Sequence, residues 1–176
     1  MMGPVKDLAL WREDALRLLG DWHLHAAMVR FYAELDAEIA ALAPVCWSRG
    51  LCCRFGAAGH NLFVTTLELL YFAGRVLAAE RRLASPETAD SRCPHQIDGR
   101  CGVREFRPLG CRVYFCQASS AWWQPTMSER WLSRLRLMHE QFAVPYAYVE
   151  WLAGLRQMRS LLDGGKAAAE RGDGRS

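Results

Sequence analysis

The seven cysteines of this 176-residue chain lie in two short segments. The first segment reads CWSRGLCC, and the second, further along the chain, reads CPHQIDGRCGVREFRPLGCRVYFC. The cysteines are Cys46, Cys52 and Cys53 in the first segment and Cys93, Cys101, Cys111 and Cys116 in the second. Thiols at this density constrain the fold, because they require disulfides, bonds to a metal, or burial among apolar side chains.

A metal centre explains these thiols better than disulfides or inert burial. Seven is an odd number, so a disulfide framework leaves one thiol over. Lys6, Asp7 and Arg12 interrupt the N-terminal stretch where a secretory signal needs an apolar run, so we expect a cytoplasmic protein with reduced thiols. Buried inert cysteines usually lie on helix faces, whereas these seven lie where helical periodicity fails. Ligand bonds to a metal would order such irregular loops.

Helical periodicity outside the cysteine segments predicts a mainly α fold, with helices flanking an irregular cysteine-rich metal-binding region and little or no β-structure. We expect a single α-rich domain over 1–162 and a flexible tail over 163–176. The parts of the domain are an N-terminal helical arm (5–42), a cysteine-cluster region (43–125) and a C-terminal helix pair (126–162).

Helix start signals support these boundaries. Asp21 is expected to cap a helix within the N-terminal arm, and Thr65 with Glu68 has the spacing of a capping box that opens a helix over 65–83. The buried stripe of that helix is expected to include Leu67, Leu70, Tyr71 and Leu77. This helix would return the chain so that the two cysteine segments meet at one site.

Two more start signals occur near the C-terminus. Thr126 and Glu129 repeat the capping-box spacing, and Pro145 suits the first turn of a last helix. The expected stripes carry Trp131, Leu135, Met138 and Phe142 on one helix and Tyr148, Trp151, Leu155 and Leu162 on the next. His139 falls on the first stripe and is expected to be a hydrogen-bonded core histidine.

The spacing of the cysteines bears on which metal they bind. Structural zinc sites favour paired C-x2-C knuckles, and no such pair occurs here. Uneven spacing and the Cys93-Pro94 step favour an iron–sulfur cluster, most of all [4Fe-4S], with Zn²⁺ as the alternative. The adjacent residues Cys52 and Cys53 cannot easily place both sulfurs on one zinc ion.

Charge also favours an anionic centre. The second cysteine segment and its flank contain five arginines against Asp98 and Glu105. They are Arg92, Arg100, Arg104, Arg107 and Arg112. Guanidinium groups offset the charge of a thiolate centre and can donate to its sulfurs. We expect Arg107 and Arg112 to contact the cofactor or to brace its loop, because each belongs to the cysteine motif.

The two segments and the intervening LFVTTLELLYFA together resemble the YkgJ-like cysteine-cluster family, described as zinc- or iron-chelating proteins. The resemblance covers 46–116 and leaves the flanking helices out. The specific second motif is Cys93-Pro94, Asp98-Gly99, Cys101, Arg107-Pro108, Cys111-Arg112, Tyr114 and Cys116. The family is in turn similar to the cysteine-rich part of flagellin lysine methylases, for which an iron–sulfur cluster is described. The resemblance therefore implies a chelated metal, without an activity.

One position departs from the family pattern CxxCxxCC, because its second cysteine is Arg49 here. A guanidinium has no lone pair to offer a metal, so Arg49 should mark an altered corner of the site. His60 and His95 are candidate substitutes, although an ordinary loop histidine with no metal role explains each of them better. If there are two centres, we expect the complete one to use the four cysteines of the second segment; a single centre would need ligands from both segments.

These observations lead to a functional hypothesis with two alternatives. The first is a [4Fe-4S] protein that acts in redox, cluster carriage or as an accessory to a protein partner. The alternatives are a zinc-stapled interaction module whose tryptophan-bearing helices form the binding surface, and a metal-dependent protein-modifying enzyme. A net charge of +3 gives no indication of nucleic-acid binding, no apolar run is long enough to span a membrane, and neither a dinucleotide-binding nor a P-loop motif is present.

Overall fold

The computed structural model describes residues 12–84 and 91–172. It is mainly helical, as predicted, and its strands are short. The helices are α1 (Arg12–Leu19), α2 (Trp22–Ala41), α3 (Phe55–Ala58), α4 (Thr66–Ala78), α5 (Leu109–Val113), α6 (Gln124–Gln141) and α7 (Trp151–Gly172). The strands are β1 (Phe63–Thr65), β2 (Gln96–Ile97), β3 (Arg100–Cys101) and β4 (Tyr148–Glu150). Short 3₁₀ turns cover Leu51–Cys53, Arg104–Phe106 and Ala118–Ser120.

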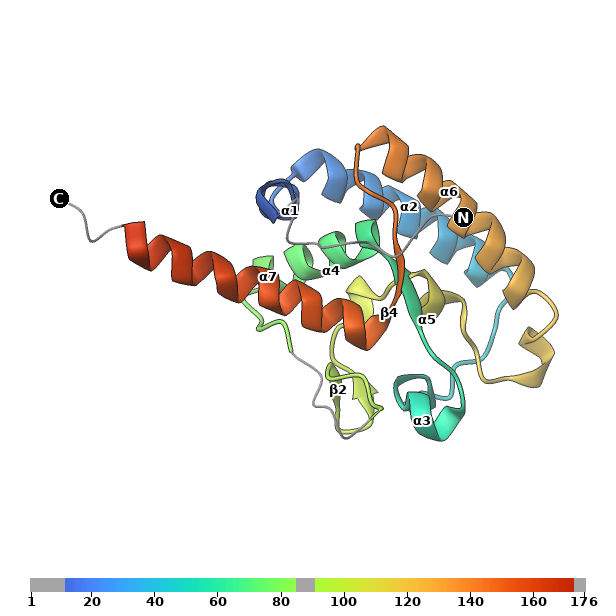
Figure 1. Cartoon of the computed structure of the whole chain (residues 1–176). Helices are drawn as coiled ribbons and strands as arrows, with labels where there is room; N and C mark the ends of the chain where they lie inside the picture. The colour runs from blue at the N-terminus through green and yellow to red at the C-terminus, as the bar shows by residue number, and fades with distance from the viewer. Residues whose placement is uncertain (1–11, 85–90, 173–176) are drawn as a thin grey trace.

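Helix α4 forms the centre of the core. It packs against α1, α2 and α7, and Figure 1 shows it enclosed between these helices. All but a few of its side chains are buried, including Leu67, Leu70 and Tyr71 of the predicted stripe. Leu77, also predicted to be buried, is 41% exposed. Each buried leucine contributes about 1.5–3 kcal/mol, so the helix is a main source of stability.

The expected capping box opens α4. The Thr65 hydroxyl accepts from the Glu68 N–H at 3.3 Å, and the Glu68 carboxylate accepts from the Thr65 N–H at 2.8 Å. The helix ends at Ala78 rather than at residue 83, because Glu80 adopts a φ of 55° and Arg81 N–H bonds back to the Val76 carbonyl at 3.0 Å.

The N-terminal arm divides as predicted, with Asp21 as the N-cap of α2. Its carboxylate accepts from the N–H groups of His23 at 2.9 Å and Leu24 at 3.2 Å. The residues before 12, part of the expected arm, lie outside the described residues. Helix α2 is not a free arm, however. One face of it is buried against α4 and α5, with Met28 and Leu35 fully enclosed.

Three predictions for the C-terminal part are corrected. Helix α6 starts at Gln124 with Pro125 in its first turn, so Thr126 lies inside the helix and is not its cap. Tyr148 lies in β4, which pairs antiparallel with β1 in the register Thr65↔Tyr148, and the last helix begins at Trp151. Helix α7 then continues to Gly172, through most of the predicted tail, and 173–176 lie outside the described residues.

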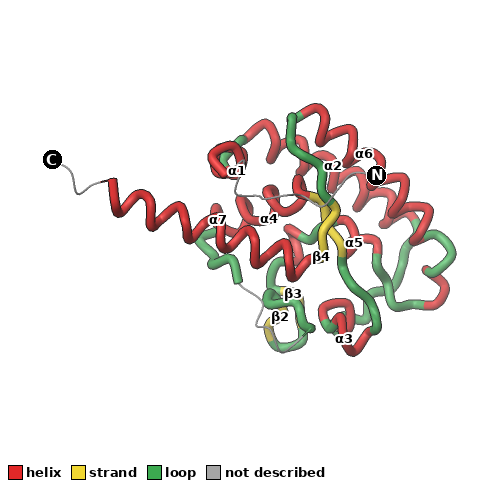
Figure 2. The backbone as a smooth tube through the Cα atoms, in the orientation of Figure 1, coloured by secondary structure: helices red, strands yellow, loops and turns green. Residues whose placement is uncertain are grey.

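Part of the cysteine-cluster region lies below the long helices in Figure 2, where it consists of loops and short elements, while α4 and α5 of the same region lie among the helices. The hairpin of β2 and β3 and the short helix α3 lie here, and β1 leads from α3 back to α4. His139 is a hydrogen-bonded core histidine, as predicted. Its Nδ1 lies 3.0 Å from the Val144 carbonyl, and the Leu67 N–H lies 3.4 Å from its Nε2.

Candidate metal centre

The two cysteine segments meet directly, as predicted. The Cys93 N–H donates to the Cys53 carbonyl at 2.8 Å, and Arg54 pairs with Arg92 in an isolated antiparallel bridge. The side-chain amide of Gln96 donates to the Gly50 carbonyl at 2.8 Å. Backbone and side-chain bonds therefore join the segments independently of their thiols.

Two glycines make this junction possible. Gly50 has a φ of 67°, and a Cβ on it would lie 2.0 Å from the Gly99 carbonyl oxygen. Asp98 and Gly99 have φ values of 48° and 75° and form the two-residue turn between β2 and β3. Asp-Gly is a strong signal for such a hairpin, and we did not predict this one from the sequence.

Cys53 lies at the centre of a group of thiols. Those of Cys52, Cys93 and Cys101 each lie within hydrogen-bonding reach of it. The hydrogen bond to Cys101, then those to Cys52 and Cys93, raise the pKa of Cys53. Cys52 and Cys101 accept these hydrogen bonds from Cys53, which lowers the pKa of each thiol to about 6. Burial raises both pKa values but has the smaller effect. Cys53 and Cys93 are buried, whereas Cys52 and Cys101 are partly exposed.

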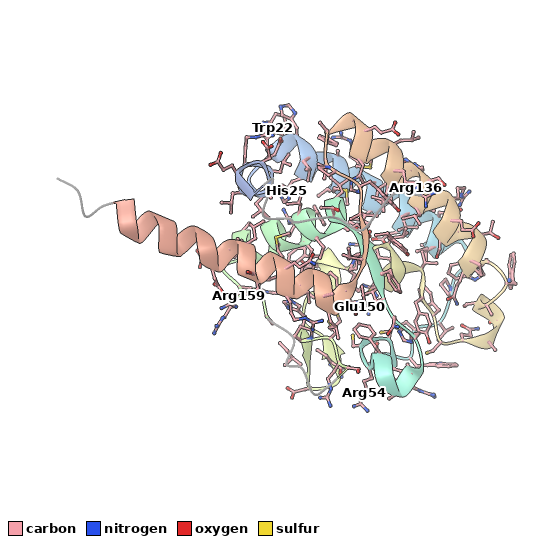
Figure 3. All side chains as sticks on the ribbon, viewed as in Figure 1. Trp22, His25, Arg54, Arg136, Glu150 and Arg159 are labelled. Carbon is pink, nitrogen blue, oxygen red and sulfur yellow. The ribbon has the colours of Figure 1, made fainter. Side chains whose placement is uncertain are left out.

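Trp151 contributes a contact to this group that was not predicted from the sequence. Its indole N–H donates to the Cys93 sulfur at 3.4 Å. The hydrogen bond from Cys53 and this indole bond lower the pKa of Cys93, against the effect of burial. Trp151 is held at the start of α7 by its own N–H bond to the Leu62 carbonyl at 2.8 Å. The Glu150 side chain, labelled in Figure 3, caps the same helix start by accepting from the Leu152 and Ala153 N–H groups.

The other three cysteines lie around this group. Cys111 is on α5, and burial raises its pKa, together with the nearby thiols of Cys93, Cys52 and Cys101. Cys46 and Cys116 are exposed. The thiols in contact with Cys53 come from both segments, as a single centre would require, and are not the second-segment quartet that we expected for the case of two centres.

All seven cysteines line one cavity of about 420 Å³. The described residues that line it include four arginines and no carboxylate. The arginines are Arg49, Arg100, Arg104 and Arg107. Arg107 is the most enclosed of them: its side chain donates to the carbonyls of Arg104 at 3.1 Å and Cys111 at 3.3 Å, and burial lowers its pKa. Arg54, at the lower edge of Figure 3, is exposed and does not line the cavity.

Arg112 has a different role from Arg107. It does not line the cavity, and its guanidinium is 4.1 Å from the centre of the Tyr32 ring. It donates to Asp36 Oδ2 at 2.5 Å, to the Glu105 carbonyl at 2.6 Å and to the Arg107 carbonyl at 2.7 Å. Of the two functions expected for it, Arg112 therefore has that of a brace, which ties the cysteine loop to α2.

The other candidate site residues are Arg49, His60 and His95, and only Arg49 lines the cavity. Arg49 lines the cavity, and its guanidinium lies 4.6 Å from the centre of the Trp47 ring. The rings of His60 and His95 lie 5.0 Å from those of Tyr114 and Phe72, respectively. Neither histidine is among the described residues that line the cavity.

As the side chains stand, no group of three or more Cys, His, Asp or Glu residues within 12–84 and 91–172 has the arrangement that holds a metal ion. Three thiols contact Cys53 itself rather than a common centre. None of the helices in the described ranges is long and apolar enough to cross a membrane. Comparison with known proteins gives no matching family model, no similar curated protein and no similar solved structure.

Proposed function

We propose that this chain is a cysteine-ligated metal-cluster protein whose centre is [4Fe-4S]. It acts in redox, in cluster carriage or as an accessory to a protein partner. One observation carries the proposal: seven cysteines from two separate segments line a single cavity together with four arginines and no carboxylate. The resemblance of 46–116 to cysteine-cluster proteins supports the same conclusion.

The donor chemistry of the cavity fits such a centre. Thiolates are the ligands that iron–sulfur clusters and zinc prefer. A four-thiolate centre carries a charge of about −2, which the lining guanidinium groups offset. Cys53, Cys93 and Cys101, with Cys52 or Cys111, would hold the group, and Trp151 would donate to the Cys93 sulfur. The thiols must then turn away from Cys53 toward the cavity. When bound, the cluster supplies one-electron transfer.

Anaerobic purification followed by analysis for iron, acid-labile sulfide and zinc tests the proposal. We expect a brown protein with iron and sulfide in equal amounts. Cys53→Ser should lose most of the iron, because Cys53 contacts three other thiols. Cys116→Ser, at the exposed edge of the same cavity, is the matched control and should keep it. A colourless protein without iron, from cells grown with sufficient iron, would contradict the cluster.

A zinc-stapled interaction module is the second candidate, and the thiol contacts favour it. Zn–S bonds of about 2.3 Å place the sulfurs of a tetrahedral site close to van der Waals contact, as the thiols around Cys53 are. The adjacency of Cys52 and Cys53 opposes it. Among the tryptophans on the described helices, Trp22 on α2 is 68% exposed and belongs to the module's binding surface, whereas Trp131 and Trp151 are buried. Stoichiometric zinc with no iron or sulfide would select this candidate.

A further inference from the structure

The thiols around Cys53 are close enough to it for one of them to form a disulfide with Cys53. Cys53 is 6% exposed, and three thiols lie within hydrogen-bonding reach of it. A buried thiol in such contact can resolve an oxidised neighbour by forming a disulfide with it. Which neighbour takes part depends on geometry and on access from the cavity.

Cys101 meets both conditions better than the other two. Cys52 is the direct sequence neighbour of Cys53, and a disulfide between adjacent residues closes a strained ring. Cys93 is buried at 8% exposure, and its sulfur accepts the Trp151 indole N–H. Cys101 ends β3, lines the cavity and is partly exposed, so a small oxidant can reach its sulfur.

We propose that Cys101 and Cys53 form a hydroperoxide-reactive pair in the metal-free protein, with Cys101 as the oxidised thiol and Cys53 as the resolving thiol. The disulfide itself does not depend on the proposed function, but its effect on metal loading does. If the two residues are metal ligands, their disulfide blocks loading of the metal centre until a reductant opens it.

The reaction needs no reagent besides the peroxide. The Cys101 sulfur attacks one oxygen of hydrogen peroxide, the O–O bond breaks, and Cys101 sulfenic acid and water form. The Cys53 sulfur then bonds to the Cys101 sulfur, and the sulfenic hydroxyl leaves with the Cys53 thiol proton as a second water. Two thiols are thus oxidised by two electrons to one disulfide, and one peroxide is reduced to two waters.

Tryptic peptide mapping tests the pairing, because the arginines of this segment separate its cysteines. The metal-free, reduced protein is treated with hydrogen peroxide, its free thiols are blocked, and it is digested without reductant. Cys101 lies in peptide 101–104, Cys93 in 93–100, Cys116 in 113–130, and both Cys52 and Cys53 in 50–54. We expect peptide 50–54 linked to 101–104 as the main disulfide product.

Variants assign the link within 50–54. Cys52→Ser should keep the link to 101–104, whereas Cys53→Ser and Cys101→Ser should lose it. Cys116 is the exposed comparison on the same cavity, and it should be trapped as a sulfenic acid by dimedone rather than as a disulfide. Persistence of the link in Cys53→Ser, or a link from 50–54 to 93–100 instead, would overturn the assignment.

Metal loading separates this inference from the proposed function. Iron and sulfide, or zinc, are offered to the reduced and to the peroxide-treated protein. We expect at least about tenfold lower uptake after oxidation, with recovery on reduction. A protein that forms the disulfide but takes up no metal when reduced would refute the metal centre while keeping the reactive pair. A protein that loads metal but forms no 53–101 disulfide would refute the pair alone.

Discussion

Residues of the same type differ widely in their chemistry within this cavity. The thiols of Cys52 and Cys101 have pKa values of about 6, mainly because Cys53 donates to them. The pKa of Cys53 is raised by the same hydrogen bonds, and that of Cys111 is raised mainly by burial. In the metal-free protein Cys53 therefore keeps its proton, whereas Cys52 and Cys101 lose theirs more readily than an ordinary thiol.

Gly50 is the residue on which the junction of the two segments depends most. Gly50→Ala should destabilise the protein by about 3–5 kcal/mol, because it adds the cost of a positive φ to a collision with the Gly99 carbonyl oxygen. Gly59→Ala is the matched control. Gly59 has a φ of 65°, but no atom lies within 4 Å of the added Cβ, so we expect only about 1–2 kcal/mol. Urea unfolding measures both, and equal losses would show that the close approach carries no cost.

At the scale of elements, Glu68 connects the core helix to the helix that carries Cys111. Its carboxylate accepts from the Thr65 N–H as part of the capping box, from the Leu109 N–H of α5 at 2.7 Å and from the Tyr32 hydroxyl at 3.2 Å. Burial raises the pKa of Glu68 despite these three donors. One side chain thus holds α4, α5 and α2 together.

The raised pKa of Glu68 predicts a pH dependence of stability. A carboxyl whose folded pKa exceeds its unfolded value contributes stability below the unfolded pKa, and this is lost as the pH rises through the folded pKa. The free energy of unfolding of the natural chain, relative to Glu68→Gln, should therefore fall as the pH rises above the ordinary glutamate pKa of 4.5. Urea unfolding of both proteins across a series of pH values measures the difference, and a constant or rising difference would contradict the assignment.

Arg112 braces the cysteine loop, so its loss should affect the metal centre at a distance. Arg112→Ala leaves the carbonyls of Glu105 and Arg107 without their donor and should cost about 3 kcal/mol. We also expect at least about twofold lower metal occupancy. Arg134→Ala on α6, which removes an exposed pair with Glu34 of α2, should cost at most about 1 kcal/mol and leave occupancy unchanged. Indistinguishable effects of the two substitutions on occupancy and stability would refute the brace.

Local signals in the sequence predicted the elements whose causes are local. The caps at Asp21 and Thr65 depend on neighbouring residues and are found where expected. Thr126 has the same spacing relative to Glu129, but Pro125 already fits the first turn of α6, so the helix starts earlier. Strand β4 was missed because its pairing with β1 joins residues far apart in the chain, and nothing in its own sequence requires it.

At the scale of the molecule, the cysteine segments were predicted to meet, but the thiols in contact were not. Which sulfur faces which depends on the backbone bond between Cys93 and Cys53 and on the turn at Asp98-Gly99. The Trp151 contact with Cys93 likewise arises only when α7 packs on α4. The helical frame is thus specified by periodicity, whereas the cavity wall is specified by contacts between distant segments.

This division between frame and cavity predicts how the whole molecule responds to loss of its metal. The long helices supply most of the apolar core, whereas the region from Cys93 to Cys116 adds a few side chains to it and is built from the β2–β3 hairpin, short turns and the helix α5. Chelation under oxidising conditions should lower the melting temperature by about 5–10 °C, as expected for a ligand bound well above its dissociation constant.

Trypsin should then cleave faster after Arg100 and Arg104, which line the cavity, than after Arg134 on α6. Cys53→Ser, which should lose most of its metal, is the control and should respond much less to the chelator. Unchanged melting and cleavage on loss of bound metal would show that the folded cavity does not depend on it.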